Sequence, residues 1–117
     1  MRFAAAALLA AVLLAPAALA GTERCSLPYG PVVPDGNTAT AAEMKAAKAE
    51  VLQFIDDSDA YQSCIEAVTK DPAEKMTPEQ KQAAYALMDK NQQEKVAVAD
   101  AYNQALRAYK AKHGASP

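Results

Sequence analysis

The sequence predicts an all-α protein, namely an antiparallel two-helix hairpin with helices at about residues 40–69 and 78–112. Each helix begins at a capping-box pattern, a Thr followed three residues later by Glu or Gln. Apolar and small residues in the first helix then recur at unbroken alternating steps of three and four. A seven-residue polar connector separates the helices, and a connector this short makes them antiparallel neighbours. An extended Pro-rich N-terminal arm, pinned to the hairpin by a disulfide, completes the predicted fold.

Residues 1–20 have the features of a secretory signal peptide. Arg2 is followed by an eleven-residue apolar run over Ala4–Leu14. Ala18-Leu19-Ala20 then gives a small-x-small cleavage pattern. A membrane-spanning helix needs about 20 apolar residues, so this run is too short to be an anchor. We therefore expect cleavage after Ala20, no stable membrane anchor afterwards, and a mature protein in the bacterial periplasm or outside the cell.

Residues 21–39 form the predicted arm. Three prolines, together with Gly30 and Gly36, exclude regular helix in this stretch. An arm that runs back along the first helix needs side chains that pack against it. The apolar side chains expected to do so are Leu27, Tyr29, Val32 and Val33.

Cys25 and Cys64 are the two cysteines of the chain. An even number of cysteines in a short secreted protein predicts a disulfide between them. The alternatives are an intermolecular or regulatory bridge and a two-cysteine metal site, which would need further ligands. From Thr40 to Cys64 the helix is about 36 Å long, and the arm from Cys25 to Thr40 reaches about 46 Å in polyproline form. The bridge therefore requires a nearly extended arm.

The first helix begins at Thr40, which caps it, with Glu43 as the reciprocal partner. Its predicted seam, the row of side chains that faces the second helix, consists of Met44, Ala47, Val51, Phe54, Ser58, Tyr61, Ile65 and Val68.

The second helix begins at Thr77, with Pro78 in its first turn and Gln80 as the reciprocal partner. Its predicted seam consists of Tyr85, Met88, Gln92, Lys95, Ala99, Tyr102, Leu106 and Tyr109. Antiparallel pairing brings Ser58 near Asn91, where both seams are polar. This layer either fixes the register of the helices or is loosely packed and wet. The hairpin domain spans residues 40–113, and residues 114–117 form a flexible tail.

Leu52 and Ile55 lie outside the seam, on the flank of the first helix away from Cys64. They either widen the core stripe of the helix or form a contact surface for a second copy or another protein. We take them as the candidate interaction surface.

The charge balance excludes several classes of partner. The chain has 12 Lys and Arg against 14 Asp and Glu, a net charge of −2, and no basic run. Binding to nucleic acid or to an anionic membrane requires clustered positive charge, so neither is expected.

We find no pattern that indicates catalysis. His113 is the single histidine and lies near the chain end, and the four glycines form no phosphate-binding loop. The acidic cluster at Asp56, Asp57 and Asp59 lacks EF-hand spacing. The sequence therefore predicts a protein that is not an enzyme, with no catalytic residues, no cofactor and no metal site.

Two blocks of sequence resemble a family of short secreted proteobacterial helical proteins. The first is Pro34-Asp35-Gly36, Ala39-Thr40 and Glu43-Met44, and the second is Glu94-Lys95-Val96-Ala97, Tyr102-Asn103-Gln104 and Arg107-Ala108-Tyr109-Lys110. The resemblance implies envelope localisation and the arm-plus-hairpin plan, and it supplies no activity.

The start of the second helix bears a further resemblance. Met76-Thr77-Pro78-Glu79-Gln80 is similar to the Leu-Thr-x-x-Gln motif of a family of periplasmic stress chaperones. Met76 replaces the Leu, the motif occurs once rather than twice, and the chain is acidic where those chaperones are basic.

We expect a non-enzymatic envelope interaction or structural protein that binds a protein partner or associates with itself, including as a homodimer. The alternative is a periplasmic chaperone or stress sensor.

Overall fold

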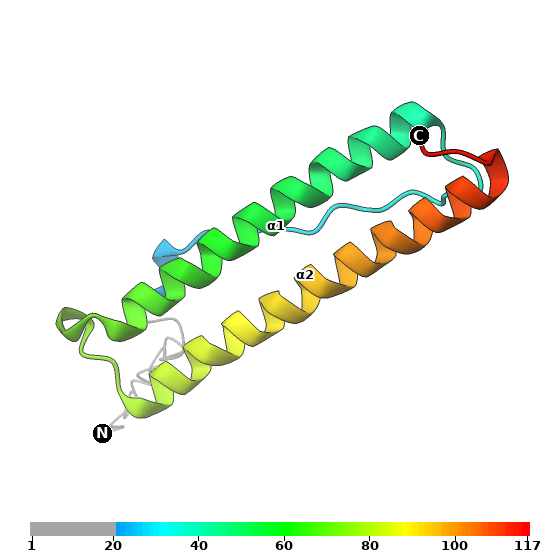
Figure 1. Cartoon of the computed structure of the whole chain (residues 1–117). Helices are drawn as coiled ribbons and strands as arrows, with labels where there is room; N and C mark the ends of the chain where they lie inside the picture. Colours follow the sequence, from blue (N-terminus) through cyan, green and yellow to red (C-terminus); the bar gives the residue numbers. More distant parts are fainter. Residues whose placement is uncertain (1–20) are drawn as a thin grey trace, which may run out of the picture.

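The computed structural model describes residues 21–117, and the predicted signal peptide lies outside them. The described chain is an all-α hairpin of two long helices, α1 over Ala41–Lys70 and α2 over Pro78–His113, which run antiparallel (Figure 1). Two short 3-10 helices, η2 over Thr22–Arg24 and η3 over Pro72–Glu74, lie in the arm and the connector. The predicted helix bounds are confirmed to within a residue. No helix in the described part of the chain is both long and apolar enough to cross a membrane.

Both helices begin at complete capping boxes. The Thr40 hydroxyl accepts a hydrogen bond from the Glu43 amide at 3.1 Å, and the Glu43 carboxylate accepts one from the Thr40 amide at 2.9 Å. Thr77 and Gln80 repeat this arrangement at 3.1 and 2.9 Å. Each box satisfies two backbone donors that the first turn of a helix leaves without partners. Capping thus accounts for the Thr and Gln of the chaperone-like motif.

We expect Thr77→Ala to lower the free energy of unfolding by about 1 kcal/mol, because the first turn of α2 then has an unsatisfied amide. Chemical denaturation monitored by circular dichroism measures this change. Thr77→Ser is the matched control, since its hydroxyl can accept the same bond, and it is expected to retain nearly all of the stability. Equal losses for the two variants would show that the cap contributes little.

The predicted seam of α1 is confirmed in full. All eight of its side chains are buried, with Met44, Ser58 and Ile65 completely inaccessible. The core divides into two clusters at opposite ends of the hairpin. One surrounds Ile65 and receives Cys25, and the other surrounds Met44 and receives Ala39.

The predicted seam of α2 is displaced by one residue at three positions, Tyr85, Gln92 and Leu106. The buried side chains are Ala84, Asn91, Ala105 and Tyr109, whereas Tyr85 is 50% exposed. Ala84, Asn91 and Ala105 each precede the residue that the sequence favoured. Ala84 and Ala105 fit between the helices because they are small, and the larger Tyr85 lies at the edge of the contact.

The polar layer at the middle of the hairpin is packed. Ser58 is fully buried and Asn91 is 1% exposed, and the Asn91 amide donates to the Ser58 hydroxyl at 3.3 Å. Gln62 donates to the Asn91 side-chain oxygen at 2.9 Å and to Gln92 at 3.1 Å. A layer whose polar groups pair across the helices stabilises one register over its neighbours.

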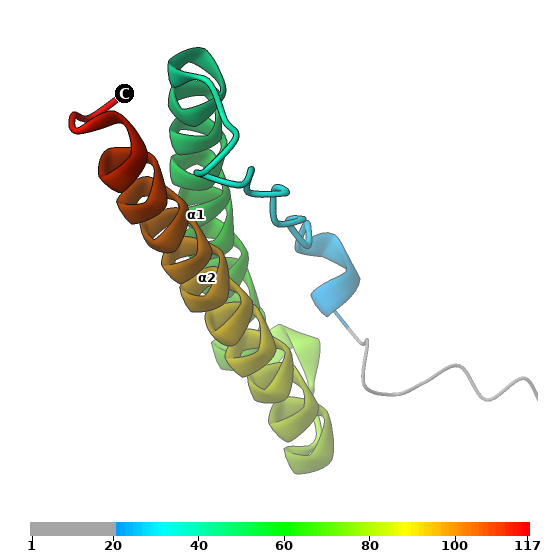
Figure 2. The ribbon, with the colours of Figure 1, turned by 90° about the vertical axis from the view of Figure 1, so that its right-hand side faces the viewer.

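The arm runs along the hairpin: its blue start lies at the outer edge of α1 in Figure 1, its cyan continuation runs between the two helices, and Figure 2 places it to one side of the pair. Two of its glycines, Gly30 and Gly36, lie close against the helices. A Cβ atom at Gly30 would lie 2.9 Å from Val98 and 3.6 Å from Phe54, and one at Gly36 would lie 1.8 Å from the Ala105 carbonyl oxygen.

The expected packing role of the arm's apolar side chains is largely wrong. Leu27, Tyr29 and Val32 are 50%, 87% and 92% exposed, and only Val33 packs against the core. Glycine backbone, rather than large side chains, brings the arm close to the helices.

Candidate functional site

The two sides of the hairpin differ in what covers them. The arm crosses one side, where it meets Cys64 and Phe54 of α1 and Val98 and Ala105 of α2. The other side, which we call the open face, carries an uncovered groove between the helices. The open face is lined by Leu52, Ile55, Ala99, Tyr102 and Leu106.

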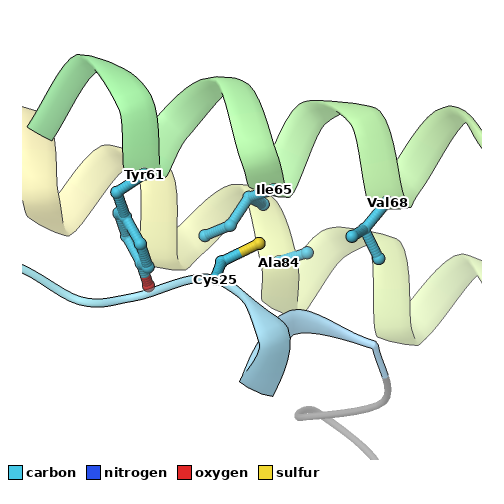
Figure 3. Close-up of a cluster of buried hydrophobic side chains, with 5 residues drawn as sticks. All are labelled: Cys25, Tyr61, Ile65, Val68 and Ala84. Carbon is cyan, nitrogen blue, oxygen red and sulfur yellow. The ribbon is translucent and has the colours of Figure 1, made fainter. Parts of the chain in front are cut away.

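Cys25 and Cys64 form the predicted disulfide, which joins residues 39 apart in sequence with a Cα–Cα distance of 5.7 Å. Cys25 is buried among Tyr61, Ile65 and Ala84 (Figure 3). Burial raises the pKa of Tyr61. The bridge thus anchors the start of the arm inside the core, which is the role expected of a structural disulfide.

A second contact holds the same end of the arm. The Arg24 guanidinium pairs with Glu74 of η3, and the hydrogen bond and charge of Glu74 raise the pKa of Arg24. Both side chains lie at the surface, so this ion pair contributes little to stability compared with the disulfide.

The candidate interaction residues Leu52 and Ile55 lie together on the open face. Leu52 is 53% exposed and Ile55 is half-buried. They line a hollow of about 230 Å³ with Val51 beneath them and with Ala99 and Tyr102 of α2 across from them. Exposed aliphatic side chains around an apolar hollow are typical of protein contact surfaces.

Lysines border the next part of the groove, toward the start of α1. A second hollow of about 510 Å³ is lined by Lys45, Lys48 and Lys110, with Tyr102 and Leu106 in its wall. The C-terminal Ser116 and Pro117 also line it. The groove therefore combines an apolar floor with a positively charged rim.

Beyond Ile55 an ion pair joins the two helices. Lys95 of α2 pairs with Asp59 of α1 at 2.7 Å. Farther along, within α1, Lys70 pairs with Glu66. The hydrogen bond and the charge of Lys70 lower the pKa of Glu66. The apolar part of the open face thus ends at the Asp59–Lys95 pair.

His113, the single histidine, lies at the end of α2 and lines neither hollow of the open face. His113 stacks on Tyr109 with ring centroids 4.1 Å apart, and its Nδ1 lies 3.0 Å from the Tyr109 carbonyl oxygen, at the end of α2. Within residues 21–117, no group of three or more His, Cys, Asp or Glu side chains is placed to hold a metal ion.

Sequence reasoning found part of this site. It placed Leu52 and Ile55 outside the seam, and the structure brings them to one hollow. It assigned Tyr102 and Leu106 to the core, and the structure packs both against the Met44 cluster while also placing them in the groove wall. The groove-lining role of these two residues and the lysine rim were missed. The steps of three and four that link Lys45, Lys48, Leu52 and Ile55 were a signal that could have found half of the rim.

No protein family matches this chain, and neither the curated proteins nor the solved structures include a match to it.

Proposed function

We propose that the protein is a secreted, non-enzymatic interaction or structural protein of the bacterial envelope, which acts by binding another protein chain on its open face. The observation that carries this proposal is the apolar groove at Leu52, Ile55 and Tyr102, which the protein's own arm leaves uncovered while covering the opposite side of the hairpin. The signal-peptide pattern of residues 1–20 and the Cys25–Cys64 disulfide support an oxidising compartment.

The contact geometry favours a helical partner. Two antiparallel helices present a shallow groove between them, and an amphipathic helix fills such a groove with side chains spaced three and four apart. Leu52 and Ile55 have this spacing on one wall, and Tyr102 and Leu106 have a spacing of four on the other.

Photo-crosslinking in cells tests the proposal. A photoreactive amino acid at Leu52 is expected to give discrete covalent adducts of the secreted protein, identified by mass spectrometry. Ala46 is the matched control position, because it is exposed on α1 but lies away from the groove. Adducts from position 52 and none from position 46 support the proposal. Absence of adducts from position 52, or the same adducts from both, contradicts it, and a ladder of unrelated proteins would favour the chaperone alternative instead.

A substitution at Leu52, combined with a photoreactive probe at another position, tests the same surface. Leu52→Asp is expected to abolish the adduct formed from a probe at Tyr102, which lines the same hollow. Because Leu52 is 53% exposed, the variant is expected to change the free energy of unfolding by less than about 1 kcal/mol. Denaturation of the purified variant checks the second expectation. A large loss of stability would show that Leu52 packs in the core and does not belong to the contact surface.

A further inference from the structure

One flank of α1 carries an ordered sequence of charge. Lys45 and Lys48 come first, Leu52 and Ile55 follow, and Asp56 and Asp59 come last. Their steps of three and four, with Ile55 and Asp56 adjacent, place all six on the same side of the helix. We call this set the polarised flank. It borders the open face, since Lys45, Lys48, Leu52 and Ile55 line the two hollows described above.

Most charges of the polarised flank form no ion pair within residues 21–117. Among residues 21–117, the ion pairs are Arg24–Glu74, Lys70–Glu66 and Lys95–Asp59. Lys45, Lys48 and Asp56 belong to none of them, and Asp59 keeps 59% of its side chain exposed beside Lys95. The flank thus presents two free positive charges, an apolar centre and available negative charge.

The order of charges on the polarised flank is complementary to the same order read in the opposite direction. A two-fold axis through Leu52 sets two copies of α1 antiparallel, which places Lys48 against Asp56 of the second copy and Lys45 against Asp59 of the second copy. A parallel arrangement would instead place like charges together. Two-fold interfaces require this kind of self-complementary surface, because each contact occurs twice.

We infer that the occupant of the open face is a second copy of this chain, paired antiparallel through the polarised flank. The inference rests on the function proposed above and names the partner for the same surface. Leu52 of each copy lies at the axis, beside the hollow that Ile55, Ala99 and Tyr102 line. The two hairpins then form a four-helix arrangement in which both arms lie on the outside.

Charge reversal with rescue tests the inference on the oxidised full chain, with the dissociation constant measured by sedimentation equilibrium. We expect a concentration-dependent dimer. Lys48→Asp and Asp56→Lys, each alone, are expected to weaken it at least about tenfold, because each change places like charges together at two symmetric contacts. Lys48→Asp combined with Asp56→Lys reverses both members of each pair and is expected to restore the dissociation constant to within about threefold.

The matched control combines Lys48→Asp with Asp57→Lys. Asp57 is exposed and adjacent to Asp56, but it points away from the polarised flank toward the arm. This variant has the same composition as the rescue variant and is expected to remain weakened. A rescue variant no tighter than the control overturns the inference, and so does a monomer at all concentrations. Crosslinking from position 52 separates the two proposals: a monomer whose position 52 captures one foreign protein overturns the self-pairing alone, and a monomer that captures nothing overturns both.

Discussion

Replacing Cys25 and Cys64 together by serine is expected to lower the free energy of unfolding by about 4 kcal/mol. The bridge joins residues 39 apart, and in the chain-entropy model a closed loop of this length restricts the unfolded state by about that amount. For a chain of this size the melting temperature should fall by about 20 °C. Serine is nearly isosteric with cysteine, so the loss reports the covalent link more than the side-chain volume.

Hydrogen exchange in the same variant separates a local role from a global one. The bridge fixes Cys25, whose amide donates to the Thr22 carbonyl oxygen of η2 at 3.0 Å, so this amide should exchange faster without the bridge. Ser63→Ala is a suitable control, because Ser63 is exposed next to Cys64 and lies outside the core. An unchanged melting temperature after both cysteines are replaced would show that the arm is held by its other contacts and that the bridge is dispensable.

The sequence was most informative where apolar and small side chains recur at unbroken steps of three and four. In α1 such side chains occupy the seam from Met44 to Val68, and a helix with one apolar stripe has one way to bury it. In α2 the stripe is interrupted by polar residues and alanines. The sequence pattern placed Tyr85 in the seam, but the structure buries Ala84, whose smaller side chain fits between the packed helices. The periodicity of apolar residues in a sequence does not predict how closely two helices pack.

The arm was harder to predict for a related reason. Its general course followed from the disulfide and from the reach of an extended chain, and the structure confirms both the bridge and the path beside α1. Which residues face inward depends on the shape of the surface that the arm crosses. That surface leaves room for backbone at Gly30 and Gly36, so Tyr29 and Val32 point away from it.

The candidate site shows the same limit. The sequence distinguished Leu52 and Ile55 from the seam, because the spacing of residues fixes their position around a helix. The opposite wall of the groove comes from Tyr102 and Leu106, whose exposure depends on the rotation of α2. Both side chains pack against the core on one edge and line the groove on the other, and the seam pattern predicted only the first of these roles.

Gly36→Ala is expected to destabilise the protein by about 2–3 kcal/mol, the range typical of inserting a methyl group where there is no space. The new Cβ would lie 1.8 Å from the Ala105 carbonyl oxygen and 3.0 Å from the Tyr109 amide nitrogen. Both atoms belong to the backbone of α2, which cannot retreat without losing its own hydrogen bonds. The arm must therefore lift, and this uncovers the cluster in which Ala39 packs against Met44.

Gly30→Ala provides the contrast that makes this prediction specific. Its new Cβ would lie 2.9 Å from Val98 Cγ2, the end of a side chain that can rotate away. Both substitutions restrict the unfolded chain equally, a stabilising effect of about 0.4–1 kcal/mol, so this term cancels in the comparison. Urea denaturation of the two variants should show a clearly larger loss for Gly36→Ala. Equal losses would mean that the arm yields as easily at Gly36 as at Gly30, and that its passage over Ala105 does not stabilise the hairpin.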